Sequence, residues 1–327
     1  MNRRAVRLTA LSMALAVALV MVLGGCARGP SEFDQIATTA EKYLSSGRAP
    51  TISAEDVQNK IVLGKDPGYF LLSVRKPEDD AKGHVPGAIT IPWNQVYKPE
   101  NLAKLPKDKK IVVICYTGHT ASQVTMLLNL LGYEAYAMKF GMSAWTDNKD
   151  VLGMAVPVLV PGNYPMDTKV DPGKSENTPP TLKTGKKDLN SIILARAETY
   201  LTSGKAPTIS AEDVQNKVVV GKDPSYFILS VRSEEHDAKG HVPGAITIPF
   251  KQIAKLENLK KLPTGKKIIV VCYTGHTASQ TAMLLNLLGY DAYAMKFGLS
   301  AWTDDKGVLA VKPYDGKPLN YPVEPGK

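Results

Sequence analysis

Residues 111–132 have the sequence IVVICYTGHTASQVTMLLNLLG. Residues 111–115 form a short apolar run rich in β-branched side chains, which is typical of a strand buried on both faces of a parallel sheet. Residues 120–131 are apolar on almost every side and stop at Gly132, which predicts a buried helix ended by a glycine. Strand, loop and helix in this order form the repeating unit of an α/β fold.

The loop sequence CYTGHTAS at residues 115–122 occurs again, letter for letter, at residues 272–279. A shift of 157 residues (272 minus 115) aligns most of the chain with itself without a gap. Because this period is far longer than the units of solenoid proteins, each copy is expected to be a whole domain. We therefore predict two domains, 32–167 and 188–327, joined by a flexible linker rich in Pro, Gly and Lys at 168–187.

Further patterns alternate between strand and helix lengths within each copy. Apolar spacing predicts a helix at 31–44, and Ser53 is placed to cap a short helix at 54–59. Buried strands are predicted at 69–74 and 136–140. We expect each domain to be a mostly parallel sheet with right-handed crossovers, flanked by helices.

The composition is that of a folded protein, with 44% hydrophobic and 22% charged residues. Disorder and a multi-span membrane protein both fit this composition poorly. Three arginines near the N-terminus precede an uncharged apolar run at 8–23. This run is short for a membrane span and predicts a secretory signal at 1–25, with an uncleaved anchor as the alternative.

The run ends in Leu-Gly-Gly-Cys26, which resembles the lipobox of bacterial lipoproteins. The resemblance implies cleavage before Cys26 and attachment of acyl chains such as palmitate to it, which anchors a protein without a transmembrane helix. Residues 26–31 would then be a tether. Ala27 in place of Asp suggests a periplasm-facing protein anchored to the outer membrane.

Formal net charge is +9, and removal of the three signal arginines leaves +6 (9 minus 3). Nucleic acid is disfavoured as a partner, because the lysines are not interleaved with stacking aromatic residues. Anionic lipid or small anions suit this charge better, and an envelope protein partner stays open.

The chain has three cysteines, and with Cys26 assigned to lipid only Cys115 and Cys272 remain, one in each copy. Exported proteins normally pair their cysteines, so an unpaired thiol there is either buried and inert or present for its reactivity. One cysteine per domain and no clustered His or carboxylate pattern argue against a metal site. No cofactor is expected.

Each of these two cysteines lies where a central strand ends and a helix begins, which is where open α/β sheets bind ligands. The helix N-terminus favours the nucleophilic thiolate, and Gly118 lets backbone N–H groups turn inward as an anion nest. Thr120 can donate its hydroxyl to the cavity or cap the helix. The expected binding residues around the thiol, in the two copies, are Tyr116, Thr117, Gly118, His119 and Thr120, and Tyr273, Thr274, Gly275, His276 and Thr277.

Both copies resemble the rhodanese family of sulfurtransferases. The loops match the C-x-x-G-x-T-A pattern of its two-domain members, and the segment GHVPGAITIP, from Gly83 and Gly240, is similar to the family's Gly-His-Ile-Pro-Gly-Ala. The Leu-Ser-Val-Arg segments and the terminal Phe-Gly-(Met/Leu)-Ser-Ala-Trp segments resemble two more family features. The resemblance covers nearly all of each copy and implies two tandem rhodanese-like α/β domains.

The resemblance implies sulfur transfer in two steps. Cys115 and Cys272 would take a sulfane sulfur from thiosulfate, polysulfide or a similar donor as a persulfide, and then give it to a thiol, cyanide or another acceptor. By position, Arg75 and Arg232 match an arginine that binds the anionic donor in some relatives. A structural ion pair is the equal alternative for both arginines.

The chain also departs from the family pattern. Tyr116-Thr117 and Tyr273-Thr274 are neutral where thiosulfate-using relatives carry cations, which weakens the case for thiosulfate. Ser73 and Ser230 replace the family's aspartate, which leaves the two arginines without their usual acidic neighbour. Both copies keep the cysteine, so two working sites or two sulfur-carrying sites are expected.

Two roles are open for His119 and His276: assistance to an anionic donor in the protonated form, or hydrogen bonding at the rim. A phosphatase of the Cdc25 type is disfavoured, since Ala121 and Ala278 stand where its phosphate-binding arginine would be. The stronger alternative is a non-catalytic binding or sulfur-carrier module that docks an envelope redox or transport complex.

Overall fold

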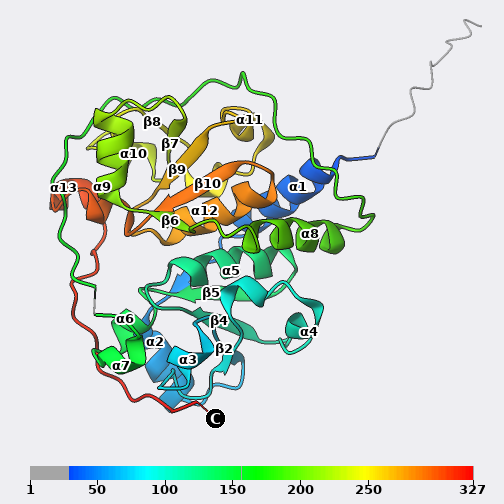
Figure 1. Ribbon diagram of the computed structural model, residues 1–327, viewed down its shortest axis with the longest axis vertical. Helices are drawn as coiled ribbons and strands as arrows, with labels where there is room; N and C mark the ends of the chain where they lie inside the picture. The colour runs from blue at the N-terminus through cyan, green and yellow to red at the C-terminus, as the bar shows by residue number, and fades with distance from the viewer. Residues whose placement is uncertain (1–28, 156, 327) are drawn as a thin grey trace, which may run out of the picture.

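A computed structural model describes residues 29–155 and 157–326 of the chain. Two five-stranded parallel sheets, one in each domain, form the core of the fold. The strand orders are β1-β5-β4-β2-β3 and β6-β10-β9-β7-β8, so the second sheet repeats the first. The predicted tandem α/β domains with parallel sheets are confirmed (Figure 1).

The first domain alternates short strands with helices. Its strands are β1 (Thr51–Ile52), β2 (Tyr69–Ser73), β3 (Ile89–Thr90), β4 (Lys110–Ile114) and β5 (Glu134–Met138). Its helices are α1 (Glu32–Ser45), α2 (Ala54–Asp56), η1 (Val57–Leu63), α3 (Pro77–Asp80), η2 (Trp93–Gln95), α4 (Pro99–Leu102), α5 (His119–Leu130), α6 (Met142–Trp145) and α7 (Lys149–Leu152).

The second domain repeats this order. Its strands are β6 (Thr208–Ile209), β7 (Tyr226–Ser230), β8 (Ala245–Thr247), β9 (Lys267–Val271) and β10 (Asp291–Met295). Its helices are α8 (Leu189–Leu201), α9 (Ala211–Asp213), η3 (Val214–Val220), α10 (Glu234–Asp237), η4 (Phe250–Gln252), α11 (Leu256–Leu259), α12 (His276–Leu287), η5 (Gly298–Ala301) and α13 (Lys306–Leu309).

β4 is the central strand of its sheet and is buried on both faces. Ile111 and Val113 belong to the core under α5, while Val112 and Ile114 belong to the core on the opposite face. Side chains alternate across a strand, so an unbroken apolar run serves both cores at once. The carboxyl end of β4 is thereby fixed in the middle of the domain.

Element bounds differ slightly from the pattern. The helix predicted at 120–131 is α5, which begins one residue earlier, and Gly132 follows it in the left-handed region at φ +82°. The strand predicted at 136–140 is β5, two residues earlier, because Glu134 pairs with Lys110 of β4 and Phe140 leaves the sheet at φ +60°.

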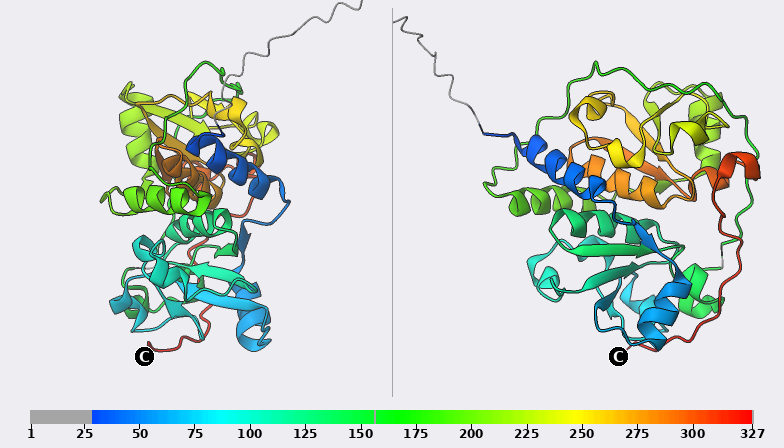
Figure 2. Two further views of the ribbon diagram at one scale, coloured as in Figure 1. Left: turned by 90° about the vertical axis from the view of Figure 1, so that its right-hand side faces the viewer. Right: turned by 180° about the vertical axis from the view of Figure 1, so that it is seen from behind.

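The domains pack through α5 and α12, which lie side by side between the two sheets (Figure 2). One hydrophobic core includes residues of both helices and of both sheets. Two buried cross-domain hydrogen bonds flank it: Tyr43 Oη donates to Gln280 Oε1 (3.1 Å), and Tyr200 Oη donates to Gln123 Oε1 (2.8 Å). One core therefore continues from the first domain into the second, while each domain keeps a second core on the outer face of its sheet.

The domains also exchange the segments that follow their last helices (Figure 1). Strap 1, residues 162–167, was assigned to domain 1 on the sequence repeat but packs on domain 2, where Trp302 Nε1 donates to Pro165 O (2.9 Å). Strap 2, residues 319–324, packs on domain 1, where Trp145 Nε1 donates to Pro322 O (2.8 Å). An antiparallel bridge continues each strap, at Asp167 with His241 and at Glu324 with His84.

The segment 168–187 has no helix or strand, yet it makes specific contacts. Asn177 N donates to Lys260 O (2.8 Å), and Thr184 N donates to the carboxylate of Glu32 (2.8 Å). The predicted linker is thus held to the second domain and to α1.

No helix among the described residues is long and apolar enough to cross a membrane. The predicted signal at 1–25 and Cys26 lie outside the described residues. The tether predicted at 26–31 is described only from residue 29, ahead of the capping box that Ser31 forms at the start of α1.

Candidate functional site

The two cysteine loops have the same geometry. Cys115 follows the last residue of β4, and Gly118 adopts φ +86° just before α5. The N–H of Gly118 donates to Cys115 Sγ at 3.1 Å, and that of Gly275 (φ +89°) donates to Cys272 Sγ at 3.1 Å. Each sulfur therefore receives a backbone donor at the positive end of a twelve-residue helix.

Glycine is required at Gly118 for two reasons. A left-handed φ disfavours any side chain, and a Cβ atom there would lie 2.4 Å from His276 Nε2. The equivalent atom at Gly275 would lie 2.4 Å from His119 Nε2. The loop of each domain is thus in close contact with the histidine of the other.

The terminal Phe-Gly-(Met/Leu)-Ser-Ala-Trp segments hold the loops in place. The N–H of Met142 donates to Cys115 O (2.8 Å), and Ser143 donates to Tyr116 O through its N–H (2.9 Å) and its hydroxyl (2.8 Å). In domain 2, Leu299 N donates to Cys272 O at 2.7 Å. These bonds fix the loop backbone before any ligand binds.

Both cysteines are free thiols, each 1% exposed. A cavity of about 210 Å³ lies against the Cys272 loop and is lined by both domains. Its residues are Cys272, Tyr273, Thr274, His276 and Thr277 of domain 2, Pro50, Thr51, Lys139 and Phe140 of domain 1, and Val311 and Lys312 of the C-terminal segment. The structure thus brings Cys272 and four of the five predicted loop residues of this copy together around one cavity, which neither Gly275 nor Arg232 lines.

His119 and His276 stack with ring centroids 6.1 Å apart and an interplanar angle of 10°. His276 Nε2 accepts from Phe140 N (3.0 Å), and His119 Nε2 accepts from Phe297 N (2.9 Å). Because Nε2 is an acceptor, each Nδ1 carries the proton and faces the hydroxyl of Thr274 (3.0 Å) or Thr117 (2.9 Å).

Burial, and secondarily Lys139, lowers the pKa of His276 to about 3, and burial likewise holds the pKa of His119 well below its usual value. Both rings are therefore neutral at neutral pH. This geometry favours the hydrogen-bonding role over assistance to an anionic donor.

The hydroxyls of Tyr116 and Tyr273 bond to residues outside the cysteine loops. Tyr116 Oη donates to the carboxylate of Asp79 (2.6 Å), and burial together with this bond raises the pKa of Tyr116 to about 12. Tyr273 Oη contacts His236 Nδ1 at 2.6 Å. Each phenol ring lies under the arginine of its own domain, 5.4 Å from Arg75 and 5.0 Å from Arg232.

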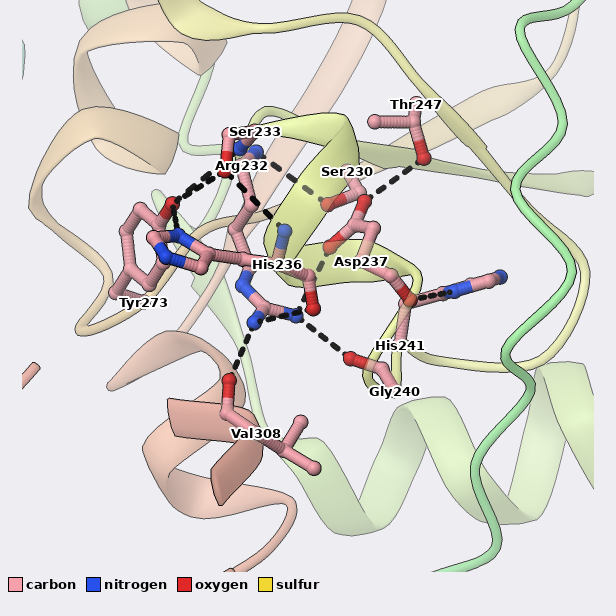
Figure 3. A network of polar contacts seen from close by, with 10 residues as sticks. All are labelled: Ser230, Arg232, Ser233, His236, Asp237, Gly240, His241, Thr247, Tyr273 and Val308. Carbon is pink, nitrogen blue, oxygen red and sulfur yellow. Dashed lines mark hydrogen bonds and ion pairs between the residues drawn. The ribbon is translucent and has the colours of Figure 1, made fainter. Parts of the chain in front are cut away.

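Arg232 is 1% exposed, and both of its terminal nitrogens, Nη1 and Nη2, donate hydrogen bonds, while its buried Nε has no hydrogen-bond partner (Figure 3). It donates from Nη1 to Asp237 Oδ1 (2.9 Å) and Gly240 O (2.7 Å), and from Nη2 to Val308 O (2.6 Å). Arg75 is fully buried and donates to the carbonyl oxygens of Gly83 and Val151, with its Nε 3.7 Å from Asp80 Oδ1.

These contacts favour the structural ion pair for both arginines over direct contact with a donor. They also correct one expectation: the arginines do have an acidic neighbour, supplied by Asp80 and Asp237 from α3 and α10 rather than by the strand. An acid five residues after each arginine, in both copies, was the sequence signal. Burial lowers the pKa of Arg232, while charge on Asp237 and, more weakly, on Cys272 raises it.

Sequence reasoning did not identify Lys139 or Phe140 as part of the Cys272 site, because they come from the other domain. Thr120 and Thr277 are half-buried, and no side-chain hydrogen bond caps α5 or α12. Among the described residues, no group of three or more His, Cys, Asp or Glu side chains could hold a metal ion.

Comparison with known proteins finds two matches to the rhodanese-like domain model, at residues 53–148 and 210–305. A putative sulfurtransferase of Bacillus subtilis, YtwF, is 34% identical over 94 residues, which are 29% of this chain and 87% of that protein. A human thiosulfate:glutathione sulfurtransferase is 30% identical over 97 residues, 26% of this chain and 82% of that protein. A rhodanese-like domain protein from Staphylococcus aureus matches in structure with 28% identity, 31% and 94% coverage and a TM-score of 0.28.

Proposed function

The chain belongs to the rhodanese-like domain family, and we propose that it is a sulfurtransferase that carries sulfane sulfur as persulfides on Cys115 and Cys272. Relatives named as sulfurtransferases support this assignment. The observation that carries it is the pair of backbone N–H groups, one per domain, that donate to a free cysteine sulfur at 3.1 Å. A donor fixed at this atom stabilises negative charge on the thiolate and on the persulfide that replaces it.

With thiosulfate as the donor, the first step is displacement at the sulfane sulfur. The cysteine thiolate attacks that sulfur, the S–S bond to the sulfonate breaks, and sulfite leaves with the electron pair. The cysteine then bears a persulfide anion with the same charge as the thiolate. In the second step an acceptor thiolate or cyanide attacks the outer sulfur and releases the cysteine thiolate.

The residues of the loop position the reacting sulfur rather than exchange protons. The two histidines are neutral and bonded at both ring nitrogens, and neither step above requires proton transfer at the cysteine. The N–H groups of Met142 and Leu299 bond the carbonyl oxygens of Cys115 and Cys272 and so hold the loop backbone in one conformation. The loop is therefore preorganised for an anion.

Sulfur loading tests this proposal. Mature protein incubated with thiosulfate or polysulfide is expected to gain about one sulfur atom per domain, measured as intact mass. Cys115→Ser and Cys272→Ser should each remove about half of this capacity, and the double variant should remove all of it. An unloaded wild type, or a loaded double variant, contradicts persulfide formation at these residues.

A non-catalytic sulfur-carrier or binding module is the second candidate. The 1% exposure of both thiols and the burial of Arg75 and Arg232 against carbonyl oxygens and an acid favour it, because they limit access and remove two cations from donor binding. Such a module would load sulfur stoichiometrically from a partner but would not turn over with thiosulfate and cyanide. Steady-state thiocyanate formation distinguishes it from an enzyme.

We further propose that Cys26 anchors the protein by acyl chains to the outer membrane, facing the periplasm. The apolar run at 8–23 and the Leu-Gly-Gly-Cys sequence support this location. The donor is then a small sulfur anion of the periplasm, and an envelope protein stays open as a source or acceptor of sulfur.

A further inference from the structure

Each cysteine loop faces the turn that follows the last strand of the other domain. Lys139 and Phe140 follow β5, and Phe140 N donates to His276 in the loop of Cys272. Lys296 and Phe297 follow β10, and Phe297 N donates to His119 in the loop of Cys115. Each lysine is thereby held, through its neighbour's amide, next to the histidine in the cysteine loop of the opposite domain.

The loops themselves provide no cation. The loop residues after each cysteine are neutral, namely Tyr116, Thr117, Tyr273 and Thr274. The arginine of each domain bonds to carbonyl oxygens and lies against the aspartate of its own domain, Asp80 or Asp237. An anionic sulfur donor therefore needs positive charge from another source.

Lys139 meets this need at Cys272. It lines the 210 Å³ cavity, and no carboxylate among the described residues lies within 4.0 Å of its ammonium group. Lys312 lines the same cavity and is exposed like Lys139, but it is paired with Asp315 at 3.1 Å. A cavity of about 210 Å³ is large enough for a small anion and too small for a folded partner.

The positive field of each lysine reaches the opposite loop. Lys139 contributes to the lowered pKa of His276, and Lys296 contributes to the lowered pKa of His119. Lys296 follows β10 as Lys139 follows β5, but it is half-buried, 5.7 Å from the ring centroid of Phe297, whereas Lys139 is exposed.

We propose that each site takes its cation from the opposite domain. Lys139 of domain 1 binds the anionic sulfur donor for Cys272, and Lys296 of domain 2 binds it for Cys115. This inference rests on the proposed sulfurtransferase function and assigns the donor class, a small sulfur oxyanion such as thiosulfate. The donor's sulfonate end contacts the ammonium group while its sulfane end faces the thiolate. Neither domain alone then has a complete donor site.

The crossed assignment gives a test in which each site is the control for the other. Lys139→Met and Lys296→Met are combined with Cys115→Ser or Cys272→Ser, and the rate of sulfur gain from sub-saturating thiosulfate is followed by intact mass. With only Cys272 present, Lys139→Met should slow loading about tenfold, the usual effect of losing one charged contact, and Lys296→Met should leave it unchanged. With only Cys115 present, the two effects should be reversed.

Lys139→Arg should restore most of the rate at Cys272, and added salt should reduce the rate difference between the Lys139→Met variant and its parent because exposed charges are screened. Dependence of each cysteine on the lysine of its own domain, or equal dependence on both lysines, overturns the crossed assignment. The crossed assignment is also overturned if neither lysine variant changes the rate of sulfur loading at either cysteine. A wild type that gains no sulfur overturns the proposed function itself, which is a separate and recognisable result.

Discussion

The stacked pair His119 and His276 predicts a loss of stability in acid. His276 has a pKa of about 3 in the folded protein, against about 6.5 in an unfolded chain. Since the folded pKa is the lower one, the unfolded state binds the proton first, and the stability held above pH 6.5 is lost as the pH falls from there towards 3. At pH 5, about one and a half pH units below 6.5, His276 alone costs about 2 kcal/mol relative to pH 8.

The matched variant is His276→Gln, which cannot titrate and offers an oxygen near the position of Nε2. Urea unfolding at pH 8 and pH 5 gives the free energy of unfolding of each protein. The difference between the two pH values should be about 2 kcal/mol smaller for His276→Gln than for the wild type. His119→Gln should change the difference in the same direction, because burial lowers that pKa too. Equal pH dependence in the wild type and the double variant would refute the reasoning.

Two further predictions concern the straps and the N-terminus. Trp145→Ala removes a side chain of 0% exposure and its hydrogen bond to Pro322, so we expect a loss of about 3–5 kcal/mol in the free energy of unfolding. Strap 2 should also be cleaved by protease faster than strap 1. Equal cleavage of both straps would contradict the exchange of straps between the domains. Cys26→Ser should move the protein from the membrane fraction to the soluble periplasmic fraction, as judged by immunoblotting, and a variant that stays with the membrane counts against lipid anchoring.

The fold of each domain and the chemistry of the cysteine loop were predictable because they depend on residues that are close together in the sequence. The apolar run at 111–115, the glycine at 118 and the helix after it determine a local strand, turn and helix wherever the domain lies. The sequence pattern therefore located the cysteine at the end of β4 and the backbone donor beside it.

The relation between the copies was not predictable for a physical reason. Strap 1 and strap 2 share Asn-Tyr-Pro, and the two tryptophans that they cover are equivalent, so packing on the same domain or on the other one makes the same contacts. Sequence patterns that are identical in both copies cannot distinguish these arrangements. The partners of His119 and His276 were missed for the same reason, since the amides they accept from belong to the other domain.

The exchange of straps gives the molecule the arrangement of a swapped homodimer that has been joined into a single polypeptide. A fragment that ended at residue 167 would lack strap 2, which packs on Trp145. Its own strap 1 would have no second domain to pack on. Two such fragments could complete one another by trading tails. Each repeat is therefore completed by the tail of the other, and we expect separated halves of this chain to pair as dimers.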